Sequence, residues 1–161
     1  MEKDRIIIDQ LLTQWDNTVG KITGLYDSLA SWAIDEPVAP GRNTVRYIIG
    51  HLVVFQDRMI EAMELGERFF PELDTLFATA QQAGAIYPAY DELREKWVRV
   101  SQYLSQSFSK LTVDNWLSKH HYINEEDFLR EPHRNKLAIL VSRYAHLYSH
   151  MGQLHLVKQN A

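Results

Sequence analysis

Apolar residues recur every three or four positions along most of the chain, which is the spacing of one face of an α-helix. The pattern predicts a long helix from about Asp4 to Trp32 and a second from Thr44 to about Leu65, with Asn43 as its N-cap. Between them, the prolines and glycine of "DEPVAPGRN" predict a loop. No segment alternates between apolar and polar residues as a strand would.

The second half of the chain continues in the same way. The spacing predicts a short helix from Pro71 to Gln82, a long helix from about Ala89 to Leu111, and a last helix from about Arg134 to Lys158. Residues 112–133 have no sustained period, so we expect a long connection there. Four long helices with short accessory helices predict an all-α four-helix bundle, formed by one domain over residues 1–161.

Composition narrows the class of protein. The 161 residues are 45% hydrophobic and 24% charged, as in a soluble globular domain. The net charge of -4 and the interspersed charges argue against a nucleic-acid partner. The longest apolar stretch, "IIGHLVVF", is too short to cross a membrane, and "MEKDRIIIDQ" does not resemble a secretory signal. We therefore expect a cytoplasmic protein with no membrane partner.

The chain contains no cysteine, which excludes disulfides, thiolate-zinc sites and a thiol nucleophile of its own. Histidine, carboxylate or water would have to hold any metal ion. A thiol in the chemistry would have to arrive as a cosubstrate.

The stretch "RYAHLYSHMGQLHLVK" places His146 and His150 one helical turn apart, where both imidazoles can reach one ion. On a helical wheel they share a polar stripe with Arg143 and Gln153. The wheel assigns the main apolar face to Leu137, Val141, Tyr144, Tyr148, Met151 and His155. The stripe either lines a cavity or simply faces water.

His51 lies among aliphatic residues in "RYIIGHLVVF", where a buried imidazole needs a partner. Gly50 costs about 1 kcal/mol relative to alanine within a helix, which indicates that another group approaches the backbone closely. The alternative is a core histidine that is hydrogen-bonded to a backbone carbonyl, next to a glycine that allows helix packing.

The other four histidines are less suited to ligation. We expect His120 and His121, adjacent in the connection, to be exposed to solvent. His133 stands at the start of the last helix and can serve that terminus. His155 falls on the apolar wheel face, where a packed or interface histidine is expected.

Together, "NTVRYIIGHL" and "HLYSHMGQL" resemble the DinB-like family of metalloenzymes, which includes the bacillithiol transferases. The resemblance covers nearly the whole chain and implies a bundle with up-down-down-up helix order and a homodimer. It also implies that His51, His146 and His150 bind a divalent ion, usually nickel or zinc. The chain departs from the family at Ser149, where tyrosine is frequent, and this affects the expected substrate contacts.

Three imidazoles with an open fourth position are typical of a catalytic metal site. No H-E-x-x-H or E-x-x-H motif is present, and no carboxylate lies one turn from these histidines, so a base would come from another helix or from "NEEDF". The absence of a nearby base favours transfer of a low-molecular-weight thiol to an electrophilic small-molecule substrate over hydrolysis, because a thiol ionises more readily than water. Arg143 can bind a substrate carboxylate or form a salt bridge, and Gln153 can orient a ligand, contact substrate or pack between helices.

Two hypotheses without catalysis remain open at this point. One is a helical bundle that binds metal, a small ligand or a partner protein without turnover. The other is a metal-free interaction domain.

Overall fold

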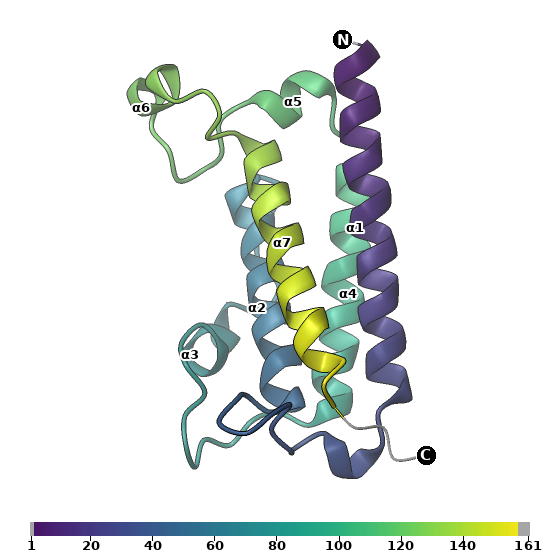
Figure 1. Ribbon diagram of the computed structural model, residues 1–161. Coiled ribbons are helices and arrows are strands. Elements are labelled where there is room, and N and C mark those ends of the chain that lie inside the picture. The colour runs from purple at the N-terminus through teal and green to yellow at the C-terminus, as the bar shows by residue number, and fades with distance from the viewer. Residues whose placement is uncertain (1, 158–161) are drawn as a thin grey trace.

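Four long helices run side by side in the computed structural model, which describes residues 2–157 (Figure 1). They are α1 (Glu2–Ser28), α2 (Val45–Ala62), α4 (Tyr90–Phe108) and α7 (Lys136–Leu154). The shorter elements are η1 (Ser31–Ala33), η2 (Pro71–Leu73), α3 (Asp74–Phe77), α5 (Val113–Leu117) and α6 (Glu125–Arg130). Residues 2–157 contain no strand, which confirms the prediction of an all-α fold.

The long helices follow the up-down-down-up order, because α2 and α4 run in one direction while α1 and α7 run in the other (Figure 1). α2 packs against α4 and α7, and α1 packs against the same two helices, so α1 and α2 are diagonal. Two parallel helices in succession require the chain to return along the bundle. Residues 63–89 make this return and carry η2 and α3, both of which pack on α2.

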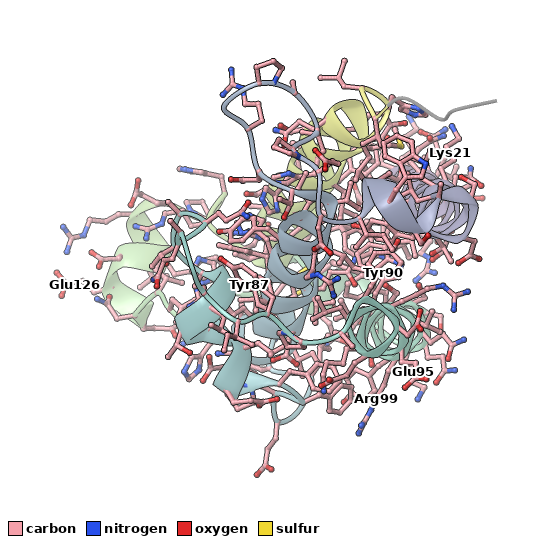
Figure 2. The ribbon with its side chains drawn as sticks, turned by 90° about the horizontal axis from the view of Figure 1, so that it is seen from below. Lys21, Tyr87, Tyr90, Glu95, Arg99 and Glu126 are labelled. Carbon is pink, nitrogen blue, oxygen red and sulfur yellow. The ribbon has the colours of Figure 1, made fainter. Side chains whose placement is uncertain are left out.

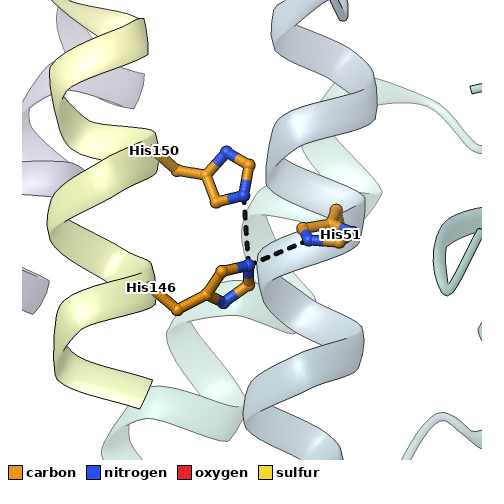
Figure 3. Close-up of side chains that lie close together, drawn as sticks. All are labelled: His51, His146 and His150. Carbon is orange, nitrogen blue, oxygen red and sulfur yellow. Dashed lines mark hydrogen bonds between the residues drawn. The ribbon is translucent and has the colours of Figure 1, made fainter. Parts of the chain in front are cut away.

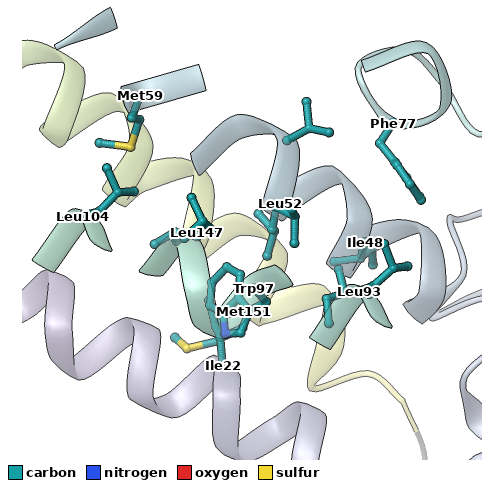
Figure 4. Packing of buried hydrophobic residues seen from close by; sticks show 14 of the residues in the cluster. Ile22, Ile48, Leu52, Met59, Phe77, Leu93, Trp97, Leu104, Leu147 and Met151 are labelled. Atoms are coloured by element: carbon teal, nitrogen blue, oxygen red, sulfur yellow. The ribbon is translucent and has the colours of Figure 1, made fainter. Parts of the chain in front are cut away.

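The core lies between the four helices and is rich in large side chains (Figure 4). Trp97 of α4 is fully buried beside Ile22 of α1, Leu52 of α2 and Met151 of α7. Burial of one such side chain stabilises a fold by roughly 1.5 to 3 kcal/mol. In α2 and α4, apolar residues that recur at the helical spacing, such as Ile48, Leu52, Trp97 and Val100, are buried, which explains why periodicity located these helices.

Several predicted helix ends were wrong. α1 stops at Ser28, four residues before Trp32, and the chain then makes the short helix η1. Thr44, not Asn43, caps α2, because its side chain accepts a hydrogen bond from the Tyr47 N–H. The predicted helix from residue 71 ends at Phe77, well short of residue 82.

The connection at residues 112–133 contains two short helices that periodicity could not detect. Thr112 and Asn115 form a capping box at the start of α5, and the Asn124 side chain caps α6. Helices of five or six residues are too short to show a hydrophobic period. The last predicted residue of the final helix, Lys158, lies outside the described residues.

The buried face of α7 also differs from the predicted face. Leu140, Leu147, Met151 and Leu154 are buried, whereas Val141 and Tyr148, which were placed on the predicted apolar face, are exposed. The exposed fractions are 45% for Val141 and 39% for Tyr148. The apolar face is therefore rotated toward the histidine stripe, so that His150 is buried at its edge.

Asp57 on α2 holds the returning segment in place. Its carboxylate is fully buried and accepts hydrogen bonds from the backbone N–H groups of Phe69 and Phe70 and from Arg68 Nε. Arg68 also binds Asp74 at the start of α3. These contacts bring η2 and α3 onto α2, one to two turns from His51.

Among residues 2–157, no helix has the combination of length and apolar character needed to traverse a bilayer.

Candidate metal centre

Three imidazoles from two helices meet between α2 and α7 (Figure 3). The Nε2 atom of His146 lies 3.0 Å from that of His51 and 3.1 Å from that of His150. Nitrogen ligands about 2.0 to 2.1 Å from one ion, at angles between about 90° and 110°, are roughly 2.9 to 3.4 Å apart. Two of the three pairs of nitrogens are therefore spaced as ligands of a shared ion would be, and the potential ligand atoms of all three histidines lie within 4.8 Å of one another.

Hydrogen bonding alone does not account for this arrangement. His51 Nδ1 lies 2.8 Å from the backbone oxygen of Phe77, which can only accept, so Nδ1 donates and Nε2 presents a lone pair. His146 Nε2 has two imidazole nitrogens close by, and one N–H can point to only one of them. A cation resolves the conflict because it can accept a lone pair from each of the three imidazoles.

Gly50 explains how Phe77 reaches His51. A Cβ atom at this position would overlap the Phe77 ring, so only glycine allows α3 to approach α2 this closely. The expectation of a close approach to the backbone at Gly50 is confirmed. The same approach places the Phe77 carbonyl where it fixes the tautomer of His51.

Gln153 lies one turn beyond His150 on α7. The Nδ1 atom of His150 is buried and has no hydrogen bond of normal geometry to the described residues. The Gln153 side chain is nevertheless close enough to raise the pKa of His150, in opposition to the larger effect of burial. Gln153 is thus near enough to orient this imidazole after a small side-chain rotation.

The environment keeps the imidazoles neutral. Burial, followed by the charge on the other two imidazoles and on Arg143, lowers the pKa of His146 to about 3. Burial and the proximity of His51 lower the pKa of His150 to about 4, and burial also lowers the pKa of His51. Neutral imidazole is the form that binds a metal, so the site is ready for ligation near pH 7.

Arg143 adjoins the histidines through the aromatic ring of Phe55. The Phe55 ring centroid lies 4.6 Å from that of His51 and 5.1 Å from that of His146. The guanidinium carbon of Arg143 lies 4.9 Å from the same centroid. Arg143 forms no salt bridge within residues 2–157, contrary to the alternative considered from the sequence.

The remaining histidines lie outside the cluster. His120 is 8% exposed and its Nδ1 accepts a hydrogen bond from the Tyr122 N–H, so the prediction of solvent exposure was wrong for this residue. A local turn, which the sequence did not reveal, folds its ring inward. His121, His133 and His155 are exposed, so His155 is not packed in the core, and its place at an interface stays a prediction.

No carboxylate joins the cluster of potential ligands found among the described residues, which consists of the three histidines alone. The "NEEDF" segment forms α6, where Glu125 and Glu126 are exposed. Viewed along the bundle, α6 with Glu126 projects to one side of the four long helices (Figure 2). The segment is thus not placed to supply a base to the imidazoles.

Comparison with protein families gives one further finding. A model described as the DinB superfamily matches residues 10–154, which include all four long helices and the three clustered histidines. A search of curated proteins gave no match.

Proposed function

The chain belongs to the DinB superfamily, and from this premise we propose that it is a metal-dependent enzyme whose ion is held by His51, His146 and His150. The observation that carries the proposal is the convergence of three imidazoles, with the Nε2 atoms of His51 and His150 lying 3.0 and 3.1 Å from that of His146. Nickel and zinc are the expected ions, since both accept imidazole ligands.

The ligand set supports catalysis over a purely structural site. Structural zinc sites are closed by four protein ligands, whereas catalytic sites use three and leave a position for water or substrate. The cluster among the described residues contains three potential ligands. A non-catalytic metal-binding bundle remains the alternative that the experiment below distinguishes.

The reaction we propose is transfer of a low-molecular-weight thiol to an electrophile, with hydrolysis of a small substrate as the second possibility. When bound, the ion would supply Lewis acidity that lowers the pKa of a thiol or water toward neutrality. In the transfer, the thiol sulfur forms a bond to the electrophilic carbon while the leaving group departs with its electron pair. The thiol proton passes to solvent, because no carboxylate adjoins the imidazoles in the described part of the chain.

The protein's own groups would position the reactants. Phe77 accepts the Nδ1 proton of His51 and so fixes that ring, and Gln153 is placed to do the same for His150. Tyr47 stacks on His51 with ring centroids 5.8 Å apart, and the Phe55 ring lies tilted against His51 with centroids 4.6 Å apart. These aromatic rings shield the imidazoles from water and restrict their motion.

Elemental analysis of the purified protein, after dialysis against a weak chelator, tests the proposal. We expect near-stoichiometric nickel or zinc in the parent and in a His121→Ala control, which removes an exposed histidine outside the cluster. His150→Ala should lose the metal. Metal-loaded protein should then accelerate the reaction of a panel of thiols with a chromogenic aryl halide.

Each result has a defined meaning. An absence of metal in the parent, together with failure of metal-free protein to take up nickel or zinc, would contradict the metal site. Stoichiometric metal that His150→Ala removes, with no turnover of thiols or of hydrolysable esters, would support the non-catalytic bundle instead.

A further inference from the structure

A cavity of about 400 Å³, lined in part by Phe55, opens between α2, α7 and the returning segment. Its lining includes three arginines, Arg58, Arg68 and Arg143, and two acids, Glu61 and Asp74. Three guanidinium groups in the wall of one small cavity are unusual, because burial of a cation is costly without a partner. Which of these five charged side chains form ion pairs with one another decides what charge a ligand of the cavity should carry.

Two of the arginines are neutralised by acids of the protein. Arg58 donates through Nη2 to Asp74 at 2.8 Å, and Arg68 donates to the same carboxylate at 2.6 Å and to Asp57 at 3.0 Å. These contacts lower the pKa of Asp74 to about 2, with Arg68 as the largest cause. Arg58 and Arg68 are therefore committed to holding α3 and the returning segment.

Of the three arginines that line the cavity, Arg143 is the one without an acidic partner among the described residues. It is half-buried, and the other acid of the cavity, Glu61, accepts a hydrogen bond from Tyr122 at 2.6 Å. Burial, and next the positive charge of Arg58, lower the pKa of the Arg143 guanidinium. The cavity thus contains one half-buried cation whose charge is not compensated by the protein.

The position of this cation relates it to the metal centre. Phe55 contacts the rings of His51 and His146 and also the guanidinium groups of Arg58 and Arg143. The guanidinium carbons of Arg143 and Arg58 lie 4.9 and 5.4 Å from the Phe55 centroid. A molecule bound by the Arg143 guanidinium would therefore lie close to the candidate metal centre, because Phe55 contacts both.

We propose that Arg143 binds a carboxylate group of the substrate or thiol cosubstrate in this cavity. The assignment rests on the proposed function, because it names the chemical class of ligand that the metal centre acts on. A guanidinium binds a carboxylate through two parallel N–H donors, which fixes orientation as well as position.

A single negative charge suits the cavity better than a dianion. The one uncompensated cation, Arg143, matches one carboxylate, whereas Glu61 and Asp74 in the same wall repel additional negative charge. A phosphate monoester carries close to two charges near neutral pH. The cavity therefore favours a monocarboxylate over a phosphate.

The test compares 3-mercaptopropionate with its neutral amide, 3-mercaptopropionamide, and with inorganic phosphate. Binding is followed by calorimetry and by the NMR signal of the Arg143 Nε–H group, in metal-free and zinc-loaded protein. We expect zinc-loaded protein to bind the carboxylate at least tenfold more tightly than the amide. The carboxylate should shift the Arg143 signal in both forms of the protein.

Variants assign the effect to the side chain. Arg143→Gln should remove the preference for the carboxylate, and Arg143→Lys should retain only part of it, because lysine cannot form the two parallel bonds. Arg42→Gln is the matched control, since Arg42 is exposed and does not line the cavity. Circular dichroism and thermal melting establish that each variant is folded.

Equal affinity for the two thiols, or an unchanged preference in folded Arg143→Gln, would overturn the proposal. Tighter binding of inorganic phosphate than of the carboxylate would also overturn it. If the protein takes up no zinc but the carboxylate still shifts the Arg143 signal, the carboxylate site stands and the metal-dependent function fails.

Discussion

At the scale of single residues, Gly50 shows how one position can support both packing and chemistry. Its missing side chain admits the Phe77 ring, and the Phe77 carbonyl then accepts the His51 Nδ1 proton. A glycine within a helix usually lowers the stability of the helix slightly relative to alanine. Here it allows the contact that orients a candidate ligand.

We predict that Gly50→Ala destabilises the protein by about 1 to 3 kcal/mol, as overpacking of a core does, and weakens metal binding. The new methyl group must displace Phe77 and with it the carbonyl that orients His51. Urea unfolding of metal-free protein and competition titration with zinc measure the two effects.

Gly20→Ala is the matched control, because Gly20 lies within α1 with open space around its Cβ direction. Helix propensity alone should make this variant more stable by up to about 1 kcal/mol, with zinc affinity unchanged. Equal behaviour of the two variants would show that the contact with Phe77 has no effect on the site.

The residues of the centre could be anticipated only in part. The pair His146 and His150 followed from helical spacing, but joining it with His51 depended on the family resemblance, since 95 positions separate residues 51 and 146. The buried position of His120 depends on a local turn that periodicity does not report. The absence of a salt bridge at Arg143 depends on the arrangement of neighbouring helices, which a single sequence does not specify.

At the scale of elements, the returning segment between α2 and α4 depends on a few polar contacts. Asp57 accepts two backbone hydrogen bonds and one from Arg68, and these hold η2 and α3 against α2. The segment carries both Phe77, which orients His51, and Asp74 in the cavity wall. Its attachment therefore controls both parts of the proposed site.

We predict that Asp57→Ala lowers the free energy of unfolding by about 3 to 5 kcal/mol, because it leaves Arg68 and two backbone N–H groups without their acceptor. Hydrogen exchange should increase at residues 67–77 before it increases in the long helices. Urea unfolding and exchange mass spectrometry check the two effects.

Asp27→Ala serves as the comparison, since Asp27 forms an exposed salt bridge with Arg94 on the other side of the bundle. Exposed ion pairs contribute little to stability, so this variant should remain close to the parent. A similar loss of stability in both variants would contradict the role assigned to Asp57.

Element prediction succeeded where a helix was long and failed where it was short. Eighteen residues of α2 provide five turns of apolar repeat, whereas five residues of α5 provide little more than one. The rotated face of α7 has a different cause. Its apolar residues extend around much of the helix, so only the positions of α1 and α2 decide which of them are buried.

At the scale of the whole molecule, the proposed ion would join α2 to α7, which are neighbours in the bundle but far apart in the chain. A ligand that binds only the folded state raises stability by about 2.7 kcal/mol when its free concentration is one hundred times its dissociation constant. The metal should therefore contribute to the stability of the entire bundle.

We predict that a strong chelator lowers the thermal midpoint of metal-loaded protein and that restored zinc or nickel raises it again. His51→Ala should remove this response, while His121→Ala should keep it. Differential scanning calorimetry at several metal concentrations measures the shift, and a midpoint independent of metal in the parent would count against the site.

The placement of the histidines also links metal uptake to the order of assembly. His146 and His150 are one turn apart, so α7 can capture an ion as soon as that turn forms. His51 can reach the same ion only after α2 and α7 have packed together, although residues 51 and 146 are 95 positions apart in the chain. Bringing them together costs the entropy of closing a long loop. His51 would therefore be the last of the three proposed ligands to reach the ion, and an ion bound by all three histidines would indicate that the bundle has closed.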